Sequence, residues 1–400
     1  MRSGLKKAAA AVLAVILAAS LCGCDRGYIM TVDGIEIRNG IYLSYLRSSY
    51  SMALSEVKKQ NSDNETSSDG ETSSVPVTKE QIDGKSGSQW IKDETMKSVR
   101  RFVAVQRKCD ELDITLTEDE VREINSNIND TWDKENDYLM YLYGFKTMGE
   151  YYESQGIGQE SMRDILRVSK LQDKLFMYFY GKGGSLEVKD SEIDEYLKEN
   201  YAAVKLQSFA YTDASGKKLE TDEDKNAVKE KAQKYADRIN AGEKPIDIFY
   251  EYELSKAEDA AKAKAETDYN EDNEDKLTKD EWIKKQVEAA NIEKAESEDD
   301  LDRFLSKESS SLDEDLTEYI FNAASDGKAT VFAAENSVYL VVKEDITSKT
   351  KWKEENNENI LKEIKVDDFH NMVDLFGQNY EVTADESLVN KKYGPETLDE

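Results

Sequence analysis

Proline is nearly absent from this chain, with three prolines in 400 residues. A proline inside a helix removes a backbone hydrogen bond and costs roughly 3 kcal/mol, so its scarcity leaves long helices uninterrupted. The sequence is also rich in Glu, Lys, Leu and Ala, which favour helix. We therefore expect a mainly helical fold, in which strands are confined to short segments of alternating polarity.

The first residues have the pattern of an export signal. Arg2, Lys6 and Lys7 precede an apolar run over residues 8–21, in which Ser20 is the one polar residue. As a helix this run would span about 21 Å, short of the roughly 30 Å hydrocarbon core of a bilayer. That length suits a signal peptide rather than a membrane-spanning anchor.

The apolar run ends in Leu21-Cys-Gly-Cys24, which resembles a lipobox. An aliphatic residue stands three positions before Cys24 and a small residue directly before it, as acylation of that cysteine requires. We therefore expect a signal peptide over residues 1–23 and a diacylglyceryl anchor on Cys24, because two acyl chains hold a protein stably where one would not. The predicted location is the outer face of the cytoplasmic membrane, extracytoplasmic and lipid-anchored. An ordinary signal peptide followed by two incidental cysteines is the alternative.

Charge and residue usage exclude several classes of function. The formal net charge of −30 argues against nucleic acid as a partner and against a body that lies on anionic lipid. His370 is the only histidine, which nearly excludes metal sites and catalytic triads built on imidazole. No glycine-rich phosphate loop is present, so we expect no cofactor and no metal. Cys24 and Cys109 are the cysteines that follow the leader, and with Cys24 lipidated no intramolecular disulfide remains.

Apolar periodicity predicts a helical N-terminal region. Residues 29–37 alternate as a short strand with a turn at Asp33-Gly34, and a helix follows from about residue 41. Residues 60–88 are almost devoid of apolar side chains, and we expect a disordered insertion there. Further helices are predicted over residues 90–112, from Thr117, where Thr117 and Glu120 form a capping box, and over residues 161–180.

An aromatic cluster lies between the last two of these helices and admits two interpretations. Its candidate residues are Tyr138, Tyr141, Tyr143, Tyr151 and Tyr152. They either pack short helices against one another or form an adaptable surface that binds client polypeptides, because Tyr and Met tolerate many partners.

The C-terminal half predicts a small α+β module. A strand over residues 204–211 is followed by helices, and two more strands are expected at residues 329–333 and 338–343. Residues 255–299 form a very acidic insertion that we expect to be helical and solvated. A last amphipathic helix, from about residue 351 to 380, would not stay folded alone in water and is expected to pack back on the N-terminal helices.

This order of parts resembles the PrsA/SurA group, extracytoplasmic foldases that carry a parvulin-type peptidyl-prolyl isomerase module. Met30-Thr-Val-Asp-Gly-Ile-Glu-Ile37 is similar to the family's V-N-G-x-x-I opening. Val204-Lys-Leu-Gln-Ser-Phe-Ala-Tyr211 stands where parvulins have V-R-A-x-H-I-L-V, and Ser337-Val-Tyr-Leu-Val-Val-Lys343 stands for F-G-Y-H-I-I-K. Asp300-Leu301 and Phe304 fit G-G-D-L-G-W-F, although Glu298 and Asp299 replace both glycines.

The resemblance implies a helical chaperone domain completed by a C-terminal helix, plus a parvulin-like α+β domain. It implies boundaries at residues 24–200 for the first domain, 201–346 for the second, and 347–400 for the returning helix and tail. Parvulin activity is associated with two histidines on the central strands, and at these positions the chain has Ser208 and Leu340. Because leucine offers no hydrogen bond and serine cannot restore a two-imidazole network, no catalytic residue is assigned.

The function that follows is a membrane-anchored chaperone or foldase whose partners are unfolded or newly secreted proteins. Two alternatives stay open from the sequence. One is an active peptidyl-prolyl cis-trans isomerase, which the overall module favours. The other is a surface lipoprotein that serves as a scaffold for one dedicated partner.

Overall fold

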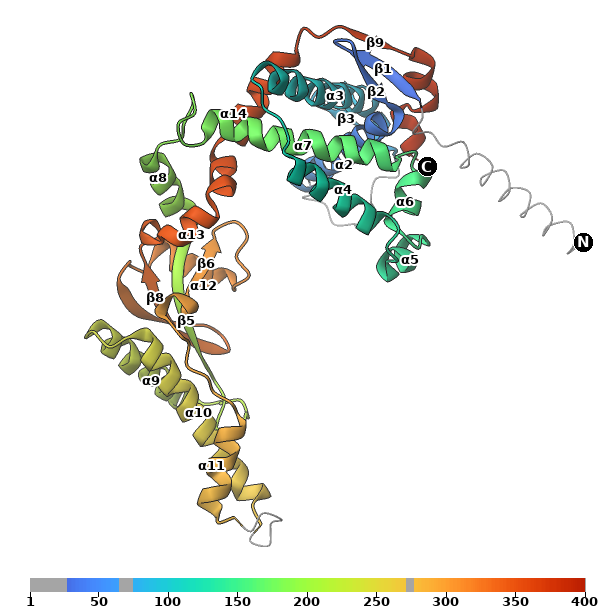
Figure 1. Cartoon of the computed structure of the whole chain (residues 1–400). Helices are drawn as coiled ribbons and strands as arrows, with labels where there is room; N and C mark the ends of the chain where they lie inside the picture. The colour runs from blue at the N-terminus through green and yellow to red at the C-terminus, as the bar shows by residue number, and fades with distance from the viewer. Residues whose placement is uncertain (1–26, 65–74, 271–276, 400) are drawn as a thin grey trace, which may run out of the picture. The chain divides into compact units, whose positions relative to one another are not determined.

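The computed structural model describes residues 27–64, 75–270 and 277–399 of the chain (Figure 1). The chain forms two compact units. The first unit takes the residues up to Glu187 together with those from Lys365 onward, and the second unit takes Val188–Ile364. The predicted combination of a mainly helical fold with an α+β part is confirmed.

A small antiparallel sheet in the first unit joins the two ends of the described chain. Strands β1 (Tyr28–Val32) and β2 (Ile35–Arg38) form a hairpin about the predicted turn, where a single short strand was expected. Its turn residues Asp33 and Gly34 both have positive φ, 50° and 77°, as a tight two-residue hairpin turn requires. The third strand, β9 (Val382–Ala384), pairs with the outer side of β1. Periodicity did not predict β9, because a three-residue strand is too short to show alternation.

Helices make up the body of the first unit. Helix α3 begins at its cap Ser86, whose side chain accepts a hydrogen bond from the Gln89 backbone, and α4 begins at the predicted Thr117–Glu120 capping box. Their apolar faces, with α7, bury Ile91, Val99 and Leu175 completely. The helices are α2 (Asn39–Asn64), α3 (Gly87–Glu111), α4 (Glu118–Trp132), α5 (Asp137–Tyr143), α6 (Met148–Ser154) and α7 (Gln159–Tyr180).

The prediction that residues 60–88 are disordered is wrong for the described part of that segment. Helix α2 continues to Asn64, and residues 75–88 form the short turn η2 (Val77–Lys79) and a second hairpin of β3 (Gln81–Ile82) and β4 (Lys85–Ser86). Ile82 and Val77 are buried, and a Cβ on Gly87 would lie 1.9 Å from the Val77 carbonyl oxygen. Two apolar anchors and an Asp-Gly turn are enough to hold this polar segment. Residues 65–74 lie outside the described residues.

The C-terminal part of α14 (Asn357–Gly377) belongs to the first unit from Lys365 on. Phe369 is buried, with its ring 5.4 Å from that of Phe176 on α7. The Arg101 guanidinium of α3 donates two hydrogen bonds to the Asp374 carboxylate, at 2.9 and 2.8 Å. The chain then follows β9 and the short turns η5 (Leu388–Lys392) and η6 (Pro395–Leu398).

The second unit is built on a four-stranded antiparallel sheet of order β6-β5-β8-β7. Helices α9 and α10 pack on one face, where the core includes Phe209, Tyr252 and Leu340. Helix α12 packs on the other face, over Val204 and Val341. The elements are β5 (Tyr201–Ala210), α9 (Asp222–Asn240), α10 (Pro245–Asp268), α11 (Lys279–Ala289), η3 (Glu298–Leu301), β6 (Arg303–Ser306), α12 (Glu314–Asn322), β7 (Lys328–Ala333) and β8 (Ser337–Glu344).

The predicted acidic insertion at residues 255–299 is largely helical and solvated in its described part, but it does not begin as a separate element. Helix α10 runs unbroken from Pro245 to Asp268, and α11 returns antiparallel to it (Figure 1). Contacts between the two helices are a Tyr269–Trp282 ring contact and a Lys279–Glu266 ion pair. Helix α11 has no buried residue, so this helical hairpin is exposed along most of its length.

The boundaries between the units differ from those predicted at residues 200/201 and 346/347. Helix α8 (Asp190–Asn200) packs on the second unit, where Leu197 is buried. The Glu363 carboxylate of α14 accepts hydrogen bonds from the Tyr196 and Tyr201 hydroxyls. The second unit therefore also contains α8, η4 (Ile346–Ser348), α13 (Thr350–Glu355) and the start of α14.

Candidate functional site

The two positions that stand for the parvulin histidines do not face each other. In the pairing of β5 with β8, Ser208 lies opposite Tyr339 and Leu340 lies opposite Gln207. Because side chains alternate across a strand, Ser208 is on the α12 face and Leu340 on the α9/α10 face, where it is fully buried. A hydrogen-bonded pair across two strands needs both side chains on one face. The residue that faces Ser208 is therefore Tyr339, and Leu340 lies on the opposite face of the sheet.

This correction does not restore an imidazole. Neither β5 nor β8 contains a histidine, and His370, the only one in the sequence, lies on α14 within the first unit. Burial and then the positive charge of Arg101 hold the pKa of His370 below its usual value. Neither facing pair contains an imidazole: Ser208 and Tyr339 carry hydroxyls, and Gln207 and Leu340 carry an amide and an aliphatic group.

The α9/α10 face carries a buried cluster of four charges. The Lys205 ammonium is 2.6 Å from Asp302 and 2.8 Å from Glu344, and Lys349 is 2.6 Å from Asp302 and also paired with Glu344. The side chains of Lys205 and Asp302 are 1% and 4% exposed. With two ammonium and two carboxylate groups the cluster is neutral, which is how buried charges are tolerated.

The pKa values within this cluster follow from its pairing. Burial lowers the pKa of Lys349, but its hydrogen bonds to Asp302 and Glu344 outweigh burial and leave that pKa raised. Burial raises the pKa of Glu344, and the bonds to Lys205 and Lys349 outweigh it in the opposite direction. Lys349 and Glu344 are thus held in their charged forms near neutral pH. Our sequence reasoning missed the cluster, although a lysine at an inward position of an apolar strand was its signal.

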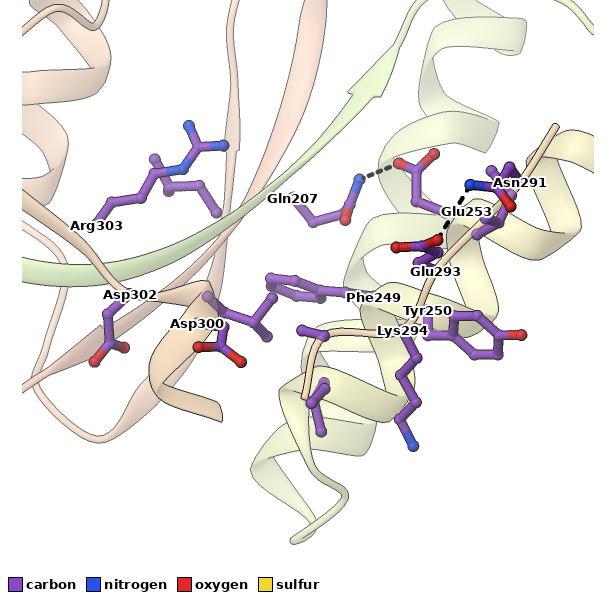
Figure 2. Close-up of a pocket in the computed structure, with 15 residues that line it drawn as sticks. Gln207, Phe249, Tyr250, Glu253, Asn291, Glu293, Lys294, Asp300, Asp302 and Arg303 are labelled. Atoms are coloured by element: carbon purple, nitrogen blue, oxygen red, sulfur yellow. Dashed lines mark hydrogen bonds between the residues drawn. The ribbon is translucent and has the colours of Figure 1, made fainter. Parts of the chain in front are cut away.

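Two adjoining pockets lie along β5, and Figure 2 shows the larger of them. The larger has a volume of about 510 Å³ and lies between β5, α10 and the segments 291–295 and 300–303. The smaller, about 380 Å³, follows β5 further along, past Ser208 to Ala210 and Tyr339. Leu206, Gln207, Glu253 and Arg303 line both. The Gln207 amide donates a hydrogen bond of 2.7 Å to the Glu253 carboxylate on α10, as Figure 2 shows.

The structure divides the tyrosine cluster of the first unit into two groups. Tyr138, Tyr141 and Tyr143 on α5 are 69%, 87% and 56% exposed. Tyr151 and Tyr152 on α6 are partly buried, and the Tyr152 ring is stacked on Trp132 at 6.0 Å. The two interpretations of the cluster thus apply to different residues: α6 packs the helices together, and α5 displays its side chains to solvent.

The α5 surface is defined here as the exposed large apolar side chains of one short helix, Tyr138, Met140, Tyr141, Leu142 and Tyr143. All five side chains are exposed, and Leu139 is the one buried residue of α5. The helix is held at both ends, by the Asn136 side chain, which accepts hydrogen bonds from the backbone of Tyr138 and Leu139, and by Gly144 in a left-handed conformation.

The remaining predicted site lies outside the described residues, since Cys24 belongs to the segment before Gly27. Cys109 is buried on α3, and burial raises the pKa of its thiol to about 11. Among the described residues no group of His, Cys, Asp and Glu side chains is arranged to hold a metal ion. In the same part of the chain no helix is long and apolar enough to cross a membrane.

The solved structures to which this chain has weak overall similarity include two PrsA foldases. The crystal structure of foldase protein PrsA from Streptococcus pneumoniae shares 13% sequence identity, covering 74% of this chain and 91% of that one, with a TM-score of 0.28. PrsA from Bacillus subtilis shares 12% identity over 76% of this chain and 89% of its own, with a TM-score of 0.26. No protein-family model matches the chain, and no curated protein matches it. Both TM-scores are too low to assign a function.

Proposed function

We propose that this chain is a lipid-anchored extracytoplasmic chaperone that binds unfolded or newly secreted polypeptides. The observation that carries the proposal is the exposed α5 surface. Soluble proteins rarely leave adjacent large apolar side chains in water, and such patches mark sites of interaction. Binding of unfolded chains requires no cofactor and no covalent chemistry.

The composition of the α5 surface suits clients of varied sequence. Tyrosine combines a large apolar ring with a hydroxyl, and methionine adapts its shape, so the same five residues can pack against many side chains. The high negative charge keeps such a protein soluble in spite of the patch. A surface built for one dedicated partner would instead need fixed, complementary geometry.

The sheet of the second unit supports peptide binding better than isomerisation. Rotation about the peptide bond has a barrier of roughly 18–20 kcal/mol, and a catalyst must bind the twisted amide more tightly than the planar one. Ser208 and Tyr339 occupy the facing positions where the two imidazoles of a parvulin would be expected. We infer that this parvulin-like module retains pockets for polypeptide and has no efficient isomerase activity.

Replacing Tyr138, Tyr141 and Tyr143 together by serine is expected to reduce suppression of aggregation several-fold, because the patch loses most of its apolar area. The measurement is light scattering of a thermally unfolding client at several chaperone ratios. Tyr178→Ser serves as the control, since Tyr178 is also an exposed tyrosine of the first unit, 47% accessible on α7. Equal suppression by the triple variant and the unchanged protein would reject the α5 surface as the client site. Absence of suppression by the unchanged protein would favour a dedicated scaffold.

Cys24→Ser is expected to release the protein from the membrane or to leave it with its leader uncleaved, because acylation of that cysteine provides the anchor. Membrane fractionation together with mass spectrometry of the N-terminus distinguishes these products. Cys22→Ser is the matched control and should remain membrane-bound and lipidated on Cys24. A cleaved Cys24→Ser protein that stays in the membrane fraction would disprove the lipid anchor.

A further inference from the structure

Strand β5 is much longer than its neighbour β6. On one side β5 pairs with β8 from Ala203 to Ala210, but on the other side it pairs with β6 only from Tyr201 to Val204. The stretch Lys205–Ala210 is therefore paired along one edge and unpaired along the other. Pairing stops because the chain before β6 forms the turn η3, which is drawn toward α10 by a hydrogen bond from the Ile246 backbone to the Glu298 carboxylate.

The backbone hydrogen bonds at the two ends of β5 show which backbone groups face the unpaired edge. In an antiparallel ladder both groups of one residue point to the same neighbour, and alternate residues point to opposite neighbours. The Asn200 carbonyl oxygen accepts from the Lys307 backbone on the β6 side, and the Tyr211 N–H donates to the Asn336 carbonyl on the β8 side. Even-numbered residues thus point toward β6, so Leu206, Ser208 and Ala210 direct their N–H and C=O groups to the unpaired edge.

These groups have no backbone partner among the described residues. The one contact recorded is a 3.4 Å hydrogen bond from the Gln207 side-chain amide to the Ser208 carbonyl. Proteins usually protect such an edge with a proline, a bulge or an outward-facing charge. The stretch Lys205–Ala210 has none of these, since the pairing with β8 is regular and Lys205 is buried.

Both pockets lie against this unpaired edge. The smaller one follows the edge itself, from Arg303 past Leu206 and Ser208 to Ala210. The larger one opens on the α10 face, where Gln207, Phe249, Ile246 and Leu301 line it. A strand laid beside β5 would place the side chain opposite Gln207 on that same face, so a single apolar side chain would enter the larger pocket.

We propose that an extended segment of an unfolded polypeptide adds as a strand to β5 along Leu206–Ala210. This rests on the proposed chaperone function and extends it, because hydrogen bonds to the main chain of a client do not depend on the identity of its side chains. The alternating donors and acceptors of an edge are matched only by another extended backbone. A second copy of this chain fits less well, because two bodies with a formal charge of −30 each repel one another.

The test uses the full chain and a fluorescent seven-residue peptide of sequence Lys-Thr-Val-Phe-Val-Thr-Lys, whose central Phe suits the larger pocket. Two analogues carry N-methyl groups, one on the residues flanking Phe (positions 3 and 5) and one on positions 4 and 6. Each analogue loses the N–H donors of one edge and keeps every side chain. The analogue whose lost N–H donors face β5 is expected to bind on the order of tenfold more weakly, because each net hydrogen bond contributes a few-fold to affinity. The analogue whose lost donors face away from β5 is expected to bind near-normally. Equal affinities of both analogues and the parent peptide would overturn the proposal.

A variant of the protein tests the same edge from the other side. Ser208→Pro removes an N–H that has no partner among the described residues, and proline is tolerated on an unpaired strand edge, so the protein should fold normally by circular dichroism. It is expected to lose peptide affinity on the order of tenfold, while Ser208→Ala, which keeps the N–H, retains it. Hydrogen exchange of the unchanged protein should show protection of the Leu206, Ser208 and Ala210 amides when peptide is added. Absence of that protection would overturn the proposal, even if Ser208→Pro should fail to fold.

The outcomes also separate this inference from the proposed function. If aggregation of unfolded clients is suppressed while the peptide leaves these amides unprotected, the chaperone stands and the β5 edge is not its site. If no unfolded client or peptide binds at all, the proposed function itself fails. Dimerisation abolished by Ser208→Pro, without peptide binding, would assign the edge to a second copy and overturn the proposal.

Discussion

Lys205→Met is expected to destabilise the second unit by about 3–5 kcal/mol. The substitution removes one ammonium from the buried cluster and leaves Asp302 and Glu344 with Lys349 alone, so an uncompensated negative charge remains inside. Because Lys205 joins β5 to the segment before β6 and to the end of β8, the loss should be felt across the sheet. Hydrogen exchange of the β5 and β8 amides, measured by mass spectrometry, reports the stability of this unit separately from the first.

Two further variants make the result specific. Lys279→Met breaks the exposed pair with Glu266 between α10 and α11 and should change stability by less than about 1 kcal/mol. Lys205→Met combined with Asp302→Leu leaves Lys349 paired with Glu344 and should recover much of the loss, since a balanced pair replaces an unbalanced group. If Lys205→Met and Lys279→Met have equal effects, burial of the cluster does not determine its contribution.

Phe369→Ala is expected to destabilise the first unit by about 3–5 kcal/mol, the usual cost of deleting a buried phenylalanine ring. The Phe369 ring is buried on α14 against Phe176 and Tyr180 of α7, so its removal leaves a cavity between the tail helix and the N-terminal helices. Denaturant unfolding monitored by exchange of the α3 and α7 amides would measure the loss.

Leu375→Ala provides the matched control on the same helix. Leu375 is 61% exposed, so its truncation should cost less than about 0.5 kcal/mol and leave helix propensity intact. Comparable losses from both variants would mean that α14 is held by its own helicity rather than by packing on α7. Loss from Phe369→Ala alone would show that the first unit depends on a segment nearly two hundred residues away along the chain.

Local sequence signals predicted the local structure well. The Asp33-Gly34 turn, the Thr117–Glu120 capping box and the apolar stripe of α3 each depend on residues close together in the chain, and each is present in the structure. The prediction of a disordered segment was wrong where the burial of two apolar side chains, Val77 and Ile82, outweighed the polar composition around them. Composition averages over a window, whereas packing is decided by single side chains.

Features that depend on pairing across the chain were not predictable from these signals. The face on which Leu340 lies follows from its register with β5, and a shift of one residue moves a strand's side chains to the opposite face. The unit to which α8 belongs follows from its contacts with residues that come much later in the sequence. The unpaired edge of β5 likewise depends on where β6 ends, and the polarity pattern of β5 itself gives no indication of that position.

The pairing of β9 with β1 has a consequence for the order in which the molecule can be assembled. Strand β1 acquires its outer neighbour only when Val382–Ala384 have been delivered, about 350 residues later in the chain. The second unit, by contrast, is one continuous stretch and is complete once Ile364 has emerged. A chain delivered N-terminus first therefore completes the second unit before the first, and β1 lacks its outer neighbour until β9 has emerged.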